Sequence, residues 1–239
     1  MRSNGTSSAR PMASSPSLRL GRRPQLSEEV ASVLRHKIMT AELLPGVPIR
    51  MDETAAELGV SVTPVREALL TLRGEGMVES APHRGYVVGD LSRTDVEDIF
   101  WLQGEAAARI ARRTAGVIDS DQRAELAAAV DRLRSAVADG DQDAIAEAEF
   151  DFHRTHNRIS GSTKLAWFLL SATRYTPHQM YASDPEWAAV ALNSHDRLIA
   201  AYEAGDADAA AAAVALQFTD GAARLTRHLS STGIRDSES

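Results

Sequence analysis

The sequence predicts a mainly α-helical protein, in which a small N-terminal unit with a β-hairpin precedes an antiparallel bundle of six helices. Apolar residues recur at helical spacing over most of the chain. Two short runs of β-type residues, 77–80 and 86–88, flank a turn-forming segment. No convincing strand pattern follows residue 90. We therefore expect residues 26–90 and 91–230 to form two separate domains.

The N-terminal unit is expected to contain three helices. The first, over residues 26–42, is indicated by an apolar face made of Leu26, Val30, Val33, Leu34 and Ile38. A turn over 44–48 separates it from a short helix at 52–58, which has acidic residues in its first turn and Gly59 at its end.

The third helix carries the most informative pattern of the chain. Ser61 or Thr63 can cap its N-terminus, and Pro64 fits its first turn, where a missing N–H costs nothing. A buried stripe is expected at helical spacing, made of Val65, Leu69 and Leu72. A short helix, a turn, a longer helix and a hairpin make a helix-turn-helix with a wing, which is an arrangement that reads DNA.

Residues 44–88 read LPGVPIRMDETAAELGVSVTPVREALLTLRGEGMVESAPHRGYVV. This run closely resembles the N-terminal domain of GntR-family bacterial transcriptional regulators, in its PG turn, its TPVREAL core and its RG-containing wing. It departs from the family pattern at Val62, where an arginine is frequent, and we expect this to alter base reading without removing the fold. The expected DNA-binding residues are Ser61, Thr63, Pro64, Arg66, Arg73, His83, Arg84 and Gly85. The alternative for Arg66 is an ion pair with Glu67 or Glu53.

Six helical segments are expected after the wing, at 93–114, 120–138, 141–160, 163–182, 185–204 and 206–230. Ser92 and Asp95 are spaced as a capping box, and Asp184 precedes Pro185 as an N-cap and first-turn pair. Pro177 should kink or end the fourth segment. The first segment is expected to bury Ile99, Leu102, Ala106 and Ile110. The tryptophans are expected in the core or in a dimer seam; they are Trp101, Trp167 and Trp187.

This second half resembles the FCD ligand-binding domain of the FadR subgroup, in the pieces LSRTDVEDIF, FHRTHNRISGSTKL, SHDRLI and AGDADAA. Six helices match the shorter variant of that domain. The resemblance implies a homodimer whose bundles bind small effectors, often with a carboxylate and commonly around a metal ion.

The chemistry of the bundle lies on two of its helices. Glu149, His153 and either His156 or Asn157 share one helix face, and His195 lies on a separate helix. The resemblance maps the metal ligands onto Glu149, His153 and His195, and the fourth falls on Gln217, whose amide oxygen is a poor ligand for zinc or nickel.

Three alternatives for these residues follow. The first is a divalent zinc, nickel or manganese site. The second is a metal-free polar pocket in which His153, Asn157 and His195 bind an organic effector. The third is a structural hydrogen-bond network. His178 and His228 are expected to be exposed.

Composition sets limits on function. The 239 residues include no cysteine, which excludes disulfides and cysteine-ligated zinc. The net charge is −7, so DNA binding needs a local cationic face made of Arg66, Arg73, His83 and Arg84. Residues 1–25 carry five arginines and no acid, and we expect a disordered arm there, which alternatively assists DNA binding, and a disordered tail over 231–239. The absence of a long apolar run or a secretory signal predicts a cytoplasmic protein.

The resulting prediction is a ligand-responsive regulator that binds a palindromic double-stranded DNA operator as a homodimer. We expect a repressor that a small organic acid releases. One alternative is a metal-dependent regulator without an organic effector, and another is an architectural DNA-binding protein. A metal-dependent enzyme with Glu149 as general base is the remaining alternative, but no nucleophile elbow, HExxH motif or phosphate-binding glycine loop supports it. We therefore expect no enzyme.

Overall fold

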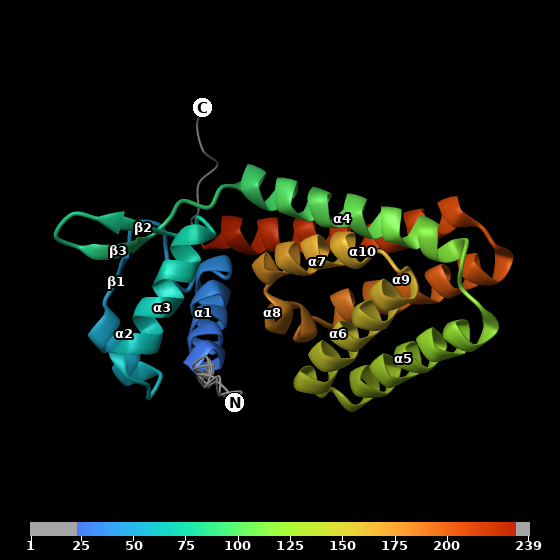
Figure 1. The fold of residues 1–239 in the computed structure, drawn as a ribbon, viewed down its shortest axis with the longest axis horizontal. Helices are drawn as coiled ribbons and strands as arrows, with labels where there is room; N and C mark the ends of the chain where they lie inside the picture. The colour runs from blue at the N-terminus through green and yellow to red at the C-terminus, as the bar shows by residue number, and fades with distance from the viewer. Residues whose placement is uncertain (1–22, 233–239) are drawn as a thin grey trace, which may run out of the picture.

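A computed structural model describes residues 23–232 and shows a winged unit at one end of an elongated helical bundle (Figure 1). The elements are, in chain order, α1 (Arg23–Met39), β1 (Pro48–Ile49), α2 (Met51–Glu57), α3 (Val62–Gly74), β2 (Val78–Ala81), β3 (Gly85–Val88), α4 (Arg93–Ala115), α5 (Ser120–Asp139), α6 (Gln142–Ile159), α7 (Thr163–Ala172), the 3-10 helix η1 (Thr173–Tyr175), α8 (His178–Ala182), α9 (Pro185–Ala204) and α10 (Ala207–Ser231). The predicted fold class is confirmed.

The winged unit contains a third strand that the sequence did not predict. The sheet order is β1-β3-β2, and all pairs are antiparallel, with Val78 opposite Val88 at the base of the hairpin. The added strand β1 has only two residues, which is too short for an alternating pattern to reveal. Its Pro48 is tolerated because β1 lies at the edge of the sheet.

The bundle follows the predicted segments except at the fourth. Pro177 ends that segment as expected, so that α7, η1 and α8 replace one continuous helix. Both predicted N-terminal caps are confirmed. Ser92 and Asp95 form a complete capping box on α4, and the Asp184 carboxylate accepts from the backbone N–H groups at the start of α9.

Helices α4 and α10 pack along their whole lengths and form one edge of the bundle (Figure 1). The stripe predicted for α4 is wrong at Leu102, which is exposed, because small residues set the buried face instead. A Cβ atom added at Gly221 of α10 would lie 2.8 Å from the ring of Phe100, and one added at Gly104 of α4 would lie 3.6 Å from Phe218. The two backbones therefore approach closely, and the larger Leu102 lies outside the seam.

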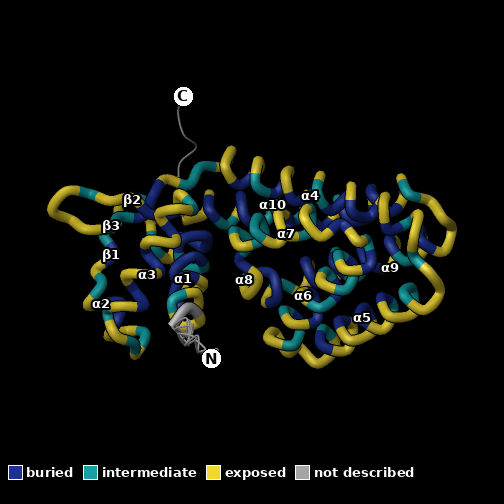
Figure 2. The backbone as a smooth tube through the Cα atoms, viewed as in Figure 1, coloured by how far each residue is buried: buried dark blue, intermediate teal, exposed yellow. Residues whose placement is uncertain are grey.

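One buried apolar cluster runs from the winged unit into the bundle (Figure 2). It joins α1 and α3 to residues at the N-terminal end of α4, at the C-terminal end of α10 and in α8, and it includes Val30, Leu69, Val96, Tyr181 and Leu229. A second cluster fills the far half of the bundle. The two halves of the chain are thus packed on each other and not only tethered by residues 89–92.

Two of the three tryptophans lie outside the core. Trp187 is buried as expected, but Trp101 and Trp167 are 66% and 59% exposed.

No helix of the described residues is long and apolar enough to cross a membrane. The predicted arm lies almost wholly, and the tail mostly, outside residues 23–232.

Candidate functional site

The predicted recognition helix is α3. It begins after Ser61, which is the N-cap residue although its side chain makes no capping hydrogen bond. Ser61, Thr63 and Arg66 are exposed, whereas Pro64 is buried and shapes the first turn from within. The exposed first turn brings hydroxyl groups, unpaired helix N–H groups and one arginine together, which is a set that suits phosphate and base edges.

Arg66 has no ion-pair partner within residues 23–232, so the alternative of a structural ion pair is not what the structure shows. Glu53 pairs with Arg50 instead, at 3.5 Å. Arg50 is an exposed cation at the start of α2, the first helix of the helix-turn-helix, and the sequence interpretation did not single it out. Its place immediately before the helix-turn-helix was the available signal.

The wing extends from the recognition helix. His83, Arg84 and Gly85 are exposed around the tip of the β2–β3 hairpin, and both His83 and Gly85 have a positive φ, of 63° and 76°. A histidine in this left-handed conformation is uncommon and is held here by the tight turn. Arg73 is exposed on the last turn of α3, and its guanidinium lies 3.5 Å from the Ser80 hydroxyl of β2.

The bundle brings together the three residues predicted as metal ligands. Glu149, His153 and His195 each offer one ligand atom, and these atoms lie within 4.8 Å of one another. His195 Nε2 lies 3.0 Å from one carboxylate oxygen of Glu149, and His153 Nε2 lies 3.3 Å from the other. Glu149 and His195 are buried, and His153 is partly exposed. Two helices, α6 and α9, thus converge on one carboxylate.

Glu149 is ionised in this setting. Burial by itself raises the pKa of its carboxyl, but the charge of His195 and the hydrogen bonds from His153 and His195 more than reverse this, so the pKa lies well below its usual value. An ionised carboxylate is what both a metal ligand and a double hydrogen-bond acceptor require.

Gln217 also lies at this cluster. Its side chain is buried on α10, and its Nε2 donates to Glu149 at 3.0 Å. Two buried atoms here, His195 Nδ1 and Gln217 Oε1, have no hydrogen-bond partner among the described residues. Such groups are normally satisfied in a folded protein, so they mark a place where a ligand or ion can supply the missing interaction.

His156 and Asn157, the alternative fourth members of the predicted face, lie apart from the cluster of ligand atoms. The His156 ring is buried, and its Nε2 lies 2.5 Å from the Tyr202 hydroxyl. Burial, together with the charges of His153 and His195, lowers the pKa of His156 to about 3, so its ring is neutral. Asn157 is half-buried one turn beyond His153. His228 is partly buried and not exposed as expected, because its Nε2 lies 3.0 Å from the backbone carbonyl of Thr40, the residue after α1.

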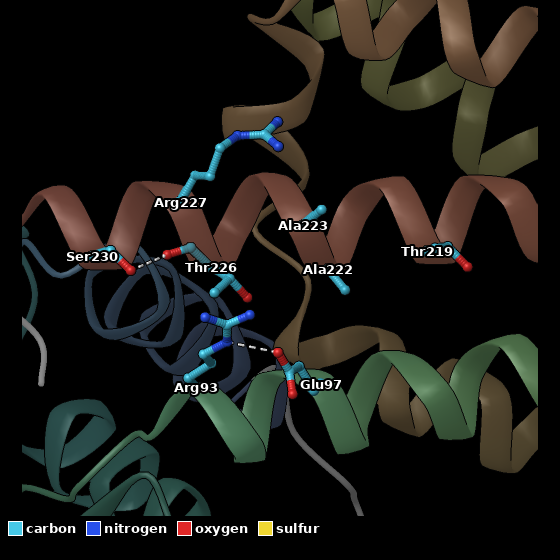
Figure 3. A pocket seen from close by; sticks show the side chains of 8 residues that line it. All are labelled: Arg93, Glu97, Thr219, Ala222, Ala223, Thr226, Arg227 and Ser230. Carbon is cyan, nitrogen blue, oxygen red and sulfur yellow. Dashed lines mark hydrogen bonds and ion pairs between the residues drawn. The ribbon is translucent and has the colours of Figure 1, made fainter. Parts of the chain in front are cut away.

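A surface groove lies elsewhere, between the start of α4 and the end of α10 (Figure 3). Arg93 and Arg227 line it, together with Glu97, which pairs with Arg93 at 2.7 Å. None of its lining residues belongs to the buried Glu149 cluster.

Comparison with known proteins follows the same division of the chain. Residues 26–88 match the bacterial regulatory proteins of the gntR family, and residues 100–229 match the FCD domain. The chain belongs to the GntR family. It is similar to the HTH-type transcriptional repressor RspR of Escherichia coli K12, with 26% identity over 77% of this chain and 82% of the relative. It is also 31% identical to a probable D-xylose utilization operon transcriptional repressor of Paenarthrobacter nicotinovorans, over 79% of this chain and 83% of that protein.

Solved structures agree on the fold. E. coli McbR/YncC gives a TM-score of 0.64 at 23% identity, covering 84% of this chain and 97% of that one. A putative GntR regulator from Rhodococcus sp. RHA1 gives 0.58 at 21% identity, with the same coverage. This GntR-family protein is therefore a DNA-binding transcriptional regulator with an FCD domain, and not an enzyme.

Proposed function

We propose that this regulator is a repressor that binds a palindromic operator as a homodimer and that a small carboxylate bound in the bundle releases it. Its DNA contacts are Ser61, Thr63, Arg66 and Arg73 on α3, with His83, Arg84 and Gly85 on the wing. Two relatives named as repressors support repression over activation. The exposure of these side chains on one helix and the adjoining hairpin supports the contact surface.

The observation that carries the effector site is the buried Glu149 cluster. Inside an apolar bundle, an ionised carboxylate, two imidazoles and an amide are costly unless each group is satisfied. His195 Nδ1 and Gln217 Oε1 are not satisfied by the described residues. A ligand that enters beside His153, the partly exposed member, would meet polar partners in an otherwise apolar surrounding, which is the usual character of a small-molecule site.

A divalent zinc, nickel or manganese ion is the second part of the proposal. The donor set fits such an ion, because carboxylate and imidazole groups converge within 4.8 Å. Glu149, His153 and His195 would hold it, and Gln217 would join them if its amide turned to present Oε1. The bound ion would supply a positive charge that attracts a carboxylate effector. The alternative of a metal-dependent regulator without an organic effector rests on this same donor set.

The proposed dimer uses the exposed apolar residues of α4 and α7, which pack side by side. The patch comprises Trp101 and Leu102 on α4 with Trp167, Phe168 and Leu170 on α7, each at least 50% exposed. Large apolar groups gathered on adjoining helices are characteristic of an interface. A second copy is the occupant that a palindromic operator requires, because one winged unit covers one half-site.

Operator titration tests this proposal. An operator is first selected from random DNA with the metal-free protein, and its Kd is then measured with and without added zinc and a panel of small carboxylates. We expect one carboxylate to weaken operator binding by about 5–150-fold, the usual range of coupling between two sites. By reciprocity, the operator should weaken that carboxylate's binding by the same factor. A carboxylate that binds the bundle and leaves the operator Kd unchanged would contradict the release mechanism.

A further inference from the structure

The end of the recognition helix is fixed to the bundle by polar contacts of one residue, Glu75. Glu75 is the C-cap residue of α3. Its carboxylate accepts from the buried guanidinium of Arg35 at 2.9 and 3.0 Å, which ties α3 to α1. The same residue also contacts the bundle. Its backbone carbonyl accepts from the Tyr175 hydroxyl at 2.9 Å, and its carboxylate lies 3.5 Å from Arg174.

Arg174 and Tyr175 belong to η1, the short helix at the break before Pro177. Gln103, a fully buried residue of α4, holds this break in place, because its Nε2 donates to the Ala172 carbonyl at 2.9 Å and lies 3.3 Å from the Thr176 hydroxyl. The segment η1 is therefore linked to the recognition helix through Glu75 and to α4 through Gln103.

The segment after η1 leads back to the Glu149 cluster. Helix α8 starts three residues beyond Tyr175 and packs on α6, the helix that carries Glu149 and His153. A change in the position of α6 can thus move α8 and η1 together. The contacts of η1 with α1 and with the end of α3 then carry that movement to the winged unit.

We propose that Glu75 is a positioning residue, which sets the orientation of the recognition helix on the bundle and makes that orientation depend on η1. This inference rests on the proposed function for its regulatory part, but the positioning itself does not require an effector. The apolar cluster holds the two halves together over a shared core, and the burial of apolar surface is by itself not directional. The hydrogen bond from Tyr175 and the ion pair with Arg174 are directional and constrain the end of α3. The hydrogen bond of His228 with the Thr40 carbonyl is a second directional contact between the halves, and the variant below leaves it in place.

The test removes the bundle side of the contact and keeps the Arg35–Glu75 ion pair, because a buried arginine left alone would destabilise the fold. Tyr175→Phe with Arg174→Met does this. Arg112→Met is the matched control, since Arg112 of α4 pairs with Asp208 of α10 and neither residue belongs to α6, α8 or η1. The chain has no cysteine, so Ala56→Cys and Ala128→Cys, both exposed, give two unique spin-label positions on α2 and α5. Labelled protein is diluted with unlabelled protein so that distances are measured within one chain.

We expect one narrow distance distribution for the parent and for the Arg112→Met control. The Tyr175→Phe, Arg174→Met variant should give a shifted or broader distribution, with unchanged zinc affinity. In the parent, zinc should change the operator Kd. In the variant, the ratio of the operator Kd with zinc to the Kd without zinc should be closer to one. If the variant keeps the parent's distance distribution, Glu75 is not a positioning residue. If zinc leaves the parent's operator Kd unchanged while the distances differ, metal regulation fails and the positioning role stands.

Discussion

At the scale of single residues, Arg66 and Arg84 have different proposed roles in DNA binding. Arg66 lies in the first turns of α3, where we propose that its side chain reaches base edges, and Arg84 lies at the tip of the wing. We expect Arg66→Ala to cost about 1–3 kcal/mol of specific binding, and Arg84→Ala to weaken binding to all sequences and lower the salt slope by about 1. Electrophoretic or anisotropy titrations at several salt concentrations measure both. Arg112→Ala is the control, because Arg112 pairs with Asp208 in the bundle and is not among the proposed DNA contacts. Equal losses on operator and random DNA for Arg66→Ala would contradict base reading.

We expect Gln217 to determine how tightly the Glu149 cluster holds the proposed metal ion. An amide oxygen is a weaker ligand than imidazole for zinc or nickel, so Gln217→His should tighten binding by roughly tenfold or more, about 1.4 kcal/mol. Gln217→Leu is the comparison, and it should lower the affinity only if the amide oxygen is a ligand. Competition with a chromogenic chelator measures each affinity. An unchanged affinity in Gln217→His would place the ion away from this cluster.

His156 should make stability depend on pH. Its pKa falls from 6.5 to about 3 on folding, so at a pH between these values the unfolded chain binds the proton that the folded ring refuses. Stability from this group is therefore fully present above pH 6.5 and is lost as the pH falls. Between pH 6.5 and 5.0 the expected loss is about 1.5 kcal/mol of unfolding free energy. Urea unfolding at the two pH values measures it, and His156→Gln should remove this part of the slope. An identical slope in that variant would show that other groups cause it.

At the scale of the elements, the junction between wing and bundle depends on Gly89. A Cβ atom at this position would lie 2.9 Å from the Gly76 carbonyl oxygen and 3.3 Å from that of Met77, and both are backbone atoms that cannot move away cheaply. We expect Gly89→Ala to destabilise the protein by about 1–3 kcal/mol, as overpacking does. Thermal unfolding measures the change. Gly116→Ala is the control, because its added Cβ would meet only an ordinary contact at 3.6 Å. Equal melting temperatures for the two variants would contradict the close approach.

Elements whose cause is local were predictable from the sequence. The caps of α4 and α9, the break at Pro177 and the strands of the wing each depend on residues a few positions apart. The seam between α4 and α10 was not predictable, because its buried face is set by glycine and alanine, which give little periodic signal. Helical spacing therefore placed Leu102 inside, although it is exposed.

Of the candidate sites, one was predictable from the sequence and one was not. Glu149 and His153 were predicted because polar residues share a helix face where apolar ones would form a plain core, and the resemblance to the FCD domain added His195. The contact of Tyr175 with Glu75 gave no such signal, since the two residues lie 100 positions apart and neither belongs to a motif of its own. Only the packing of the winged unit on the bundle brings them together.

At the scale of the whole molecule, the proposed dimer depends on the apolar patch of α4 and α7. Trp101→Ser with Trp167→Ser should give a monomer. Both indoles are exposed in the single chain, and their removal would take the largest apolar side chains out of the proposed interface. Operator affinity should fall as well, since the two winged units would no longer bind as one linked pair. Sedimentation equilibrium measures the first effect and operator titration the second. Val117→Ser is the control, an exposed apolar residue beyond the end of α4. A double variant that remains dimeric would place the interface elsewhere.

The apolar cluster shared by the two halves limits how this protein can be recombined. A biosensor is often built by joining one regulator's DNA-reading half to another's sensing half, as if the two were interchangeable parts. Here Val96 and Phe100 of α4 and Leu225 and Leu229 of α10 share one core with α1 and α3. A chimera joined at residues 89–92 would leave this surface facing a foreign partner. A chimera that preserves the core must therefore keep the first turns of α4 and the last turns of α10 together with the winged unit.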